Sequence, residues 1–178
     1  MPDNFYRFRA SKSLTNLRLT SRPKHQLQGF QISINGKPTD QLLDRVSFKV
    51  NDIVEIRRVD GLRDYPLVDF HKEFVKELLA PLPRLGNVRA LSGAFEGCKS
   101  LQRVSRDLFV NNPKLTDFTD AFKGCSALTL DLDLNPNGSV KLDGFASGCK
   151  TQATLHSRSP SRVQGYVDRA KGARCGVR

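Results

Sequence analysis

Cysteine and histidine are the residue types in this 178-residue chain that could act as nucleophiles or metal ligands, and it has four of the first and three of the second. The histidines His25, His71 and His156 lie far apart, and none is close to a cysteine or to a second histidine at the spacing of a zinc site. Cys175 and His156 form the one formal pair of nucleophile and base. We therefore predict no catalytic residue, no metal ligand and no cofactor.

Other signatures of chemistry are weak. The chain has no glycine-rich phosphate loop, no nucleophile-elbow motif and no His-Glu-x-x-His motif. Asp131 and Asp133 lie on one face of a predicted strand and could bind a cation, although two carboxylates without further oxygen ligands are also typical of a solvated strand face. These patterns predict a non-enzymatic protein without a small-molecule substrate.

Three of the cysteines end a repeated phrase. Residues 95–98 read Phe-Glu-Gly-Cys, residues 122–125 read Phe-Lys-Gly-Cys, and residues 145–149 read Phe-Ala-Ser-Gly-Cys, which is one residue longer. One such unit cannot bury its apolar face alone, so the repeat predicts units that stack on their neighbours. The predicted repeat core consists of the phenylalanines, the cysteines and the leucines that follow them: Phe95, Cys98, Leu101, Phe122, Cys125, Leu128, Phe145 and Cys149.

Each repeat is expected to form a short helix, a glycine turn and a short strand. Apolar residues at i and i+3 precede the phrase and its phenylalanine stands at i+7, which predicts the helix, and the glycine provides its end. Leucines at 128, 130, 132 and 134 alternate with polar residues, which predicts the strand. The cysteines are then expected to pack as small apolar side chains. The spacing leaves open whether Cys175 pairs with Cys149 or stays reduced.

The phrase Phe-x-Gly-Cys-x-x-Leu, together with residues 106–112 leading into residues 114–118, resembles the leucine-rich repeats of the bacterial surface-antigen (BspA-like) type. The resemblance covers about residues 84–155, and the third unit departs from the pattern. Such repeats occur in surface adhesins of bacteria and protists and in bacteriophage proteins. The resemblance thus implies a bacteriophage or bacterial origin, and binding rather than catalysis.

The predicted fold class is α+β: a small N-terminal β-sandwich-like domain, then a short leucine-rich-repeat solenoid with a C-terminal helical cap. Alternating residues around 30–34, 46–50 and 54–59, with an Asn35-Gly36 hairpin turn, place the β-domain at residues 1–60. Residues 61–83 form a connection with a helix over 70–80, the three repeats occupy 84–155, and the basic cap occupies 156–178, with a helix over 159–172.

The formal net charge is +11, and the excess lies at the two ends of the chain. We predict a polyanionic contact there, such as nucleic acid, a capsid surface or an acidic glycan, although a solvated basic surface gives the same pattern. No nucleic-acid-binding motif is present. The candidate partner-binding residues are Arg7, Arg9, Arg18, Arg22, Lys24, Arg158, Arg162, Arg169, Arg174 and Arg178.

The predicted function is that of an accessory virion component of a bacteriophage, in the capsid, neck or tail, that contacts other virion proteins or copies of itself. No apolar run reaches the length of a membrane helix, and no secretory signal is recognised at residues 1–7, so we expect assembly in the host cytoplasm and no membrane insertion. The alternatives are a bacterial surface adhesin or glycan-binding module, and a basic protein associated with nucleic acid.

Overall fold

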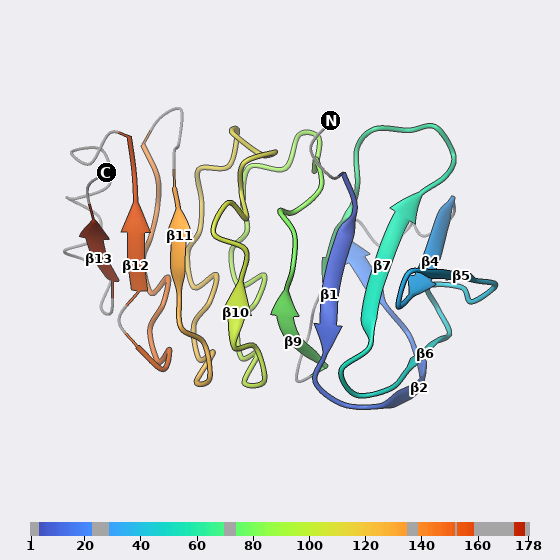
Figure 1. Ribbon diagram of the computed structural model, residues 1–178. Helices are drawn as coiled ribbons and strands as arrows, with labels where there is room; N and C mark the ends of the chain where they lie inside the picture. The colour runs from blue at the N-terminus through green and yellow to red at the C-terminus, as the bar shows by residue number, and fades with distance from the viewer. Residues whose placement is uncertain are drawn as a thin grey trace.

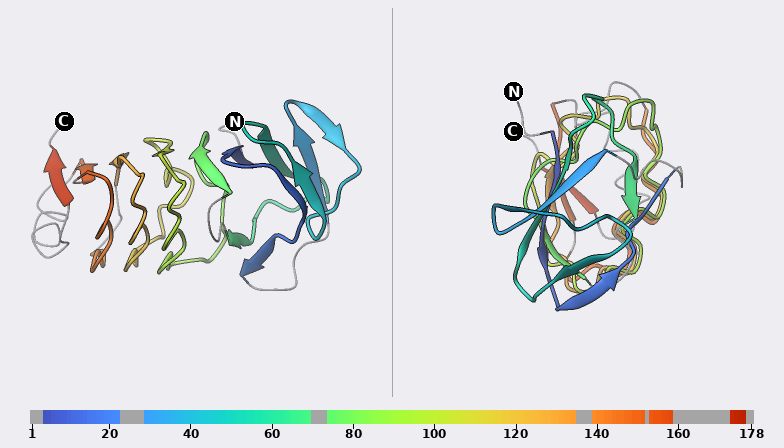
Figure 2. Two further views of the ribbon diagram at one scale, coloured as in Figure 1. Left: turned by 90° about the horizontal axis from the view of Figure 1, so that it is seen from below. Right: turned by 90° about the vertical axis from the view of Figure 1, so that its right-hand side faces the viewer.

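The computed structural model describes residues 4–22, 29–69, 74–134, 139–151, 153–158 and 173–176, and all thirteen elements in this part of the chain are β-strands (Figure 1). No helix occurs among these residues, so the predicted α+β class is wrong. The molecule is elongated, with strands β4 and β5 at one end and β13 at the other (Figure 2).

Six strands form a mixed sheet. β9 and β10 are parallel, and every other neighbouring pair is antiparallel. In spatial order the strands are β10 (Arg103–Val104), β9 (Val75–Leu78), β1 (Tyr6–Ala10), β7 (Ile53–Arg58), β4 (Phe30–Ile34) and β5 (Lys37–Thr39). Two smaller sheets pair β2 (Leu14–Leu17) with β6 (Val46–Phe48) and β3 (Thr20–Arg22) with β8 (Leu67–Asp69).

The alternating pattern of β1, an inner strand of this sheet, determines which of its faces lies in the core. Tyr6, Phe8 and Ala10 are buried, while Arg7 and Arg9 point to the other face. The Asn35-Gly36 hairpin is confirmed: both residues have positive φ, 52° and 79°, as this two-residue turn between β4 and β5 requires.

The sheet that contains β1 does not end at the predicted boundary at residue 60. Within residues 1–60 β1 pairs only with β7, and β9 from beyond residue 60 covers its second edge, whose backbone groups would otherwise lack partners. The helix predicted over 70–80 is wrong, because Val75–Leu78 form β9. Residues 70–73 of that prediction lie outside the described residues.

The repeats are bound to one another, but not as helix–strand units of a leucine-rich-repeat solenoid. Alternate backbone amides donate across to the next repeat, as Leu91 N does to Asp117 O at 2.7 Å and Phe95 N to Ala121 O at 2.9 Å. The amides between them close short turns within the repeat, as Ala94 N does to Leu91 O at 3.0 Å. In a helix the alternate amides would donate within the same segment. Here they donate to the neighbouring repeat, so the chain forms consecutive turns instead.

A column of glycines allows the repeats to approach closely. Gly97, Gly124 and Gly148 all have positive φ, from 71° to 77°. A Cβ atom on Gly124 would lie 3.7 Å from the Gly97 Cα, and one on Gly148 would lie 3.5 Å from the Gly124 Cα. Helix propagation fails at these positions because each glycine adopts the left-handed conformation.

This column also corrects the alignment of the third repeat. When the repeats are aligned on this column, Gly148 corresponds to Gly124, 24 residues earlier, just as Gly124 corresponds to Gly97, 27 residues earlier. In this alignment the third phrase contains no added residue. Phe122 N donates to Phe145 O just as Phe95 N donates to Ala121 O. Phe145 therefore occupies the position of Ala121, and the phenylalanine and alanine have exchanged places.

The exchange keeps one phenylalanine ring from each repeat in a continuous aromatic layer, but the geometry between the rings changes. Phe95 and Phe122 stack with their ring centroids 5.0 Å apart and an interplanar angle of 5°, while Phe122 and Phe145 meet edge to face at 5.4 Å and 90°. All three side chains are buried. Offset-stacked and edge-to-face geometries are the two that aromatic rings prefer.

The strands β9 to β13 lie in one row across the molecule (Figure 1). β11 (Asp131–Asp133), β12 (Ala153–His156) and β13 (Ala173–Gly176) form a parallel sheet. The backbone bond from Asp133 N to Arg106 O, 2.7 Å long, connects β11 to the loop that follows β10.

The predicted helical cap at residues 156–178 is wrong in class, because β13 pairs with β12 there. Residues 159–172, on which its helix was predicted, lie outside the described residues. One continuous hydrophobic core runs from Tyr6 in the sheet to Leu155 in β12. The loop between β10 and the second repeat is therefore anchored on a packed interior.

Candidate functional site

The predicted repeat-core residues lie inside the molecule, where all except the half-buried Cys149 are buried. Cys98, Cys125 and Cys149 are reduced. The thiol of Cys125 donates to the Phe95 carbonyl oxygen at 3.0 Å, and that of Cys149 donates to the Phe122 carbonyl oxygen at 3.3 Å. Each thiol thus bonds to the backbone of the preceding repeat.

Burial makes these thiols poor nucleophiles. It raises the pKa of Cys149 from 9.0 to about 11, and it raises the pKa of Cys125 still further above its usual range. Because the thiolate is the reactive species, both groups are inert near neutral pH. The column of Cys98, Cys125 and Cys149 therefore contributes to the packing between repeats.

His156 and the two aspartate candidates take part in two polar pairs, one between β12 and β11 and one between the loop after β10 and β11. His156 Nε2 lies 2.7 Å from Asp131 Oδ1, and Arg106 Nε lies 3.0 Å from Asp133 Oδ1. No group of three or more His, Cys, Asp or Glu side chains is placed to hold a metal ion within the described ranges. His25 and His71 lie outside those ranges, and Cys175 is placed only by its backbone, opposite Leu155.

Two of the candidate basic residues at the N-terminal end are already neutralised. Arg7 Nε lies 3.2 Å from Glu55 Oε1, and Arg9 Nε lies 2.8 Å from Glu77 Oε2, on the strands that flank β1. Arg18 is exposed. The structure therefore offers a polyanion less free positive charge on β1 than the sequence indicates.

At the C-terminal end, Arg158 is exposed and lies beside a pocket. Arg22 and Arg174 lie on β3 and β13 with side chains outside the described part. The remaining candidates are outside it altogether: Lys24, Arg162, Arg169 and Arg178.

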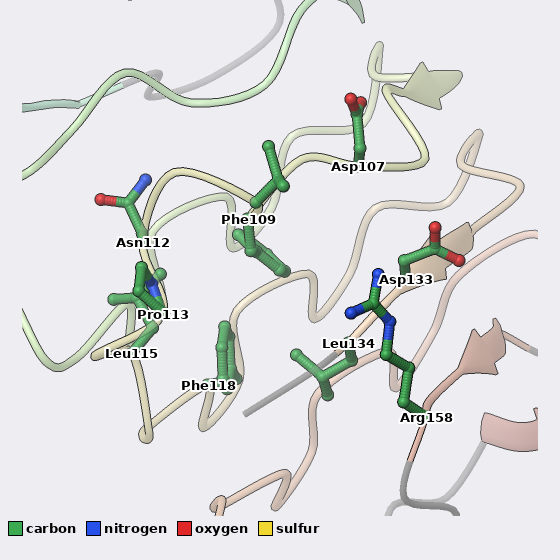
Figure 3. A pocket seen from close by; sticks show the side chains of 10 residues that line it. Asp107, Phe109, Asn112, Pro113, Leu115, Phe118, Asp133, Leu134 and Arg158 are labelled. Atoms are coloured by element: carbon green, nitrogen blue, oxygen red, sulfur yellow. The ribbon is translucent and has the colours of Figure 1, made fainter. Parts of the chain in front are cut away.

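A pocket with a volume of about 210 Å³ lies beside Arg158 (Figure 3). Buried apolar side chains form its base, where the Phe109 and Phe118 rings meet with centroids 5.0 Å apart, while its exposed lining is about equally polar and apolar. Asp107, Asp133 and Arg158 lie around the opening. The other lining residues are Val110, Asn112, Pro113, Leu115 and Leu134.

Residues 105–113, which we call the pocket loop, carry much of this wall. Asn112 is buried, and its Oδ1 accepts from Leu85 N at 2.8 Å while its Nδ2 donates to Pro83 O at 2.9 Å. Asn111 Nδ2 donates to Leu82 O at 3.0 Å. These amides satisfy the backbone of residues 82–85 and hold the loop in one place.

The tip of the pocket loop exposes an apolar side chain. Val110 is 60% exposed although its neighbour Phe109 is buried. On β11, Asp133 is engaged by Arg106, and on the pocket loop Asp107 accepts a hydrogen bond from the Ser105 hydroxyl. The site thus combines an apolar floor, an apolar tip and a rim of both charge signs.

Sequence reasoning missed this pocket, apart from Arg158. The residues that line it come from three separated segments, 107–118, 133–134 and 158. Residues 106–112 attract notice in the sequence only as part of the repeat resemblance. Val110, which stands between Phe109 and two asparagines, is a local signal that could have marked the loop, although the sequence does not show that it is exposed.

Comparisons with protein-family models, curated proteins and solved structures found no match to this chain. The likeness to BspA-like repeats therefore rests on the residues of the phrase alone. A search of the described residues for a helix of membrane-spanning length and apolarity found none.

Proposed function

We propose that this protein is a non-enzymatic binding protein whose pocket receives an apolar side chain of a partner protein. The observation that carries the proposal is the apolar pocket floor next to the exposed Val110. Buried apolar anchors ringed by polar groups dominate the affinity of protein interfaces.

The size of the pocket favours a side chain over a free small molecule. Pockets for drug-sized ligands typically measure about 300–1,000 Å³. The volume of about 210 Å³ here is smaller and matches a single apolar side chain inserted from a partner's surface. The reduced thiols of Cys98, Cys125 and Cys149 do not line it.

For the biological setting we propose a bacteriophage particle, in which the protein is an accessory capsid, neck or tail component. The support is the repeat phrase at residues 95–98, 122–125 and 145–149, with its resemblance to repeats found in phage proteins. Imaging of purified particles that carry a labelled copy tests this setting. Absence of the label from particles, with abundant label in the host cytosol, would contradict it.

Site-specific photocrosslinking tests the pocket itself. A photoreactive phenylalanine analogue at Val110 should crosslink to one partner protein in the cells or particles that contain this protein. The same analogue at Val59, which is 59% exposed and does not line the pocket, is the matched control. Equal crosslinking from both positions, or none from position 110, would overturn the proposal.

A further inference from the structure

Cationic side chains gather along the repeat segments beside the pocket. Four of them line two hollows formed by residues 84–90 and their neighbours in the next repeats. We call this set the basic strip: Arg84, Arg89, Lys114 and Lys141. From it we infer that the partner segment is acidic, with carboxylates next to the apolar side chain that fills the pocket. This inference rests on the function proposed above.

The basic strip is continuous with the pocket. A hollow of about 240 Å³ is lined by Arg84 and Lys114, and it shares Asn112 and Pro113 with the pocket wall. A chain whose apolar side chain enters the pocket can therefore continue over Pro113 toward Lys114 without leaving the surface. An extended segment advances about 3.3 Å per residue, so this contact falls within a few residues of the anchor.

The positive charge in this hollow is largely available to a partner. Within the described part, the Lys114 ammonium has one hydrogen bond, at 3.5 Å to the uncharged Asn87 Oδ1. Arg84 pairs with Asp64 at 2.8 Å, but the two side chains are 57% and 53% exposed. An exposed pair of this kind is weak and can exchange its carboxylate for one from a partner.

The second hollow, about 390 Å³ in volume, extends the strip along the repeats. Arg89 and Lys141 line it, together with the hydroxyl-bearing Thr116 and Ser139, around the carboxylate of Asp117. The Arg89 guanidinium has no hydrogen-bond or ionic partner among the described residues. Two cations therefore face one carboxylate.

That carboxylate is already engaged. Asp117 Oδ1 accepts from Thr119 N at 3.0 Å and from the Ser92 hydroxyl at 3.1 Å, and Lys141 Nζ lies 3.8 Å from Oδ2. Burial would raise the pKa of Asp117, but these hydrogen bonds and the Lys141 charge outweigh it and lower the pKa. The hollow keeps a net positive charge throughout the physiological range.

Charge complementarity separates an acidic partner from a basic one. Of the two carboxylates that line the pocket, Asp133 is paired with Arg106, which leaves Asp107 as the other acidic group. The strip side carries four cations, and the whole chain has a net charge of +11. Such a field attracts an acidic segment and repels a basic one during encounter.

Titration of the isotope-labelled full chain with two peptides tests the inference by backbone amide chemical shifts. Both peptides have the same length and a central leucine, flanked by glutamates in one and by lysines in the other. The glutamate peptide should shift the amides of Phe109 and Leu115 in the pocket and of Lys114 in the strip. The lysine peptide should bind at least tenfold more weakly.

Charge reversal identifies the contact. The variant Lys114→Glu should lower the affinity for the glutamate peptide by about three- to tenfold and should make that affinity less dependent on salt. Lys150→Glu changes an exposed lysine that lines neither hollow by the same charge and should leave affinity almost unchanged. A similar loss in both variants would overturn the assignment to the strip.

The possible failures are distinguishable. Equal binding of the two peptides, or preference for the lysine peptide, would overturn the inference of an acidic partner and leave the proposed function of the pocket intact. A glutamate peptide with serine in place of leucine separates the two parts, since equal binding of that peptide would overturn the pocket. A single-stranded oligonucleotide that shifts the strip amides more strongly than the glutamate peptide would also overturn the inference, in favour of a nucleic-acid partner.

Discussion

The N-terminal sheet and the repeats are stabilised in different ways. In the sheet, Arg9 meets Glu77, a residue 68 positions away, and Phe8 contacts both Phe48 and Phe74. In the repeats, each layer bonds to the layer 24 or 27 residues along the chain through matched amides, glycines and rings. Long-range pairing therefore determines the sheet, whereas the repeats depend on nearest-neighbour contacts.

The largest expected effect comes from removing a ring of the repeat layer. Phe122 is fully buried between Phe95 and Phe145, so Phe122→Ala should lower the free energy of unfolding by about 3–5 kcal/mol. Because the repeats depend on their neighbours, amides such as Phe95 and Gly124 should lose hydrogen-exchange protection before those of β1 and β7.

Two results would decide how separate the regions are. Phe122→Leu keeps most of the buried apolar volume and should destabilise less than the alanine variant. Equal loss of protection in β1 and in the repeats would contradict the comparison and indicate one cooperative unit, joined through the continuous core.

The next effect concerns the thiols of the repeats. In a Cys175→Ser background, Cys149 should react with a disulfide reagent about 100-fold more slowly than an unshifted thiol, because its pKa rises from 9.0 to about 11. Burial favours the neutral thiol in the folded state. Its stabilising contribution is therefore present below about pH 9 and is lost as the pH rises toward 11.

Reaction of the unfolded chain gives the reference rate for this measurement. Denaturant should bring all three repeat thiols to the rate of an exposed cysteine. Rapid reaction of Cys149 in the native protein at pH 8 would contradict the packing described for the column.

The smallest effect is expected in the sheet. A double-mutant cycle over Arg9→Ala and Glu77→Ala should give a coupling free energy of about 0.2–1 kcal/mol, because both side chains remain 20–32% exposed. The same cycle over Arg84 and Asp64, which are more exposed, should give less. A coupling at Arg9 and Glu77 well above this range would mean that ion pairing, and not only backbone pairing, determines the edge between β1 and β9.

Local patterns predicted individual strands well and their partners poorly. The Asn35-Gly36 turn and the alternation at residues 30–34 and 54–59 led to β4, β5 and β7, because turn chemistry and period-two burial act within a few residues. The pairing of β1 with β9 has no local signature. The same apolar spacing of Phe74 and Leu78 fits either a helix or a strand, and the open edge of β1 decided for the strand.

The repeat, the packing of its phenylalanines and cysteines, and the positive φ at Asn35-Gly36 and at the repeat glycines could be predicted from the sequence. Tertiary structure decided that these segments become stacked turns, that Phe145 takes the position of an alanine, and that Arg7 and Arg9 are neutralised. It also assembled the pocket from segments up to about 50 residues apart. The physical reason is that backbone hydrogen bonds and charges are satisfied by whichever partner lies nearest in space, and no periodicity along the chain records that choice.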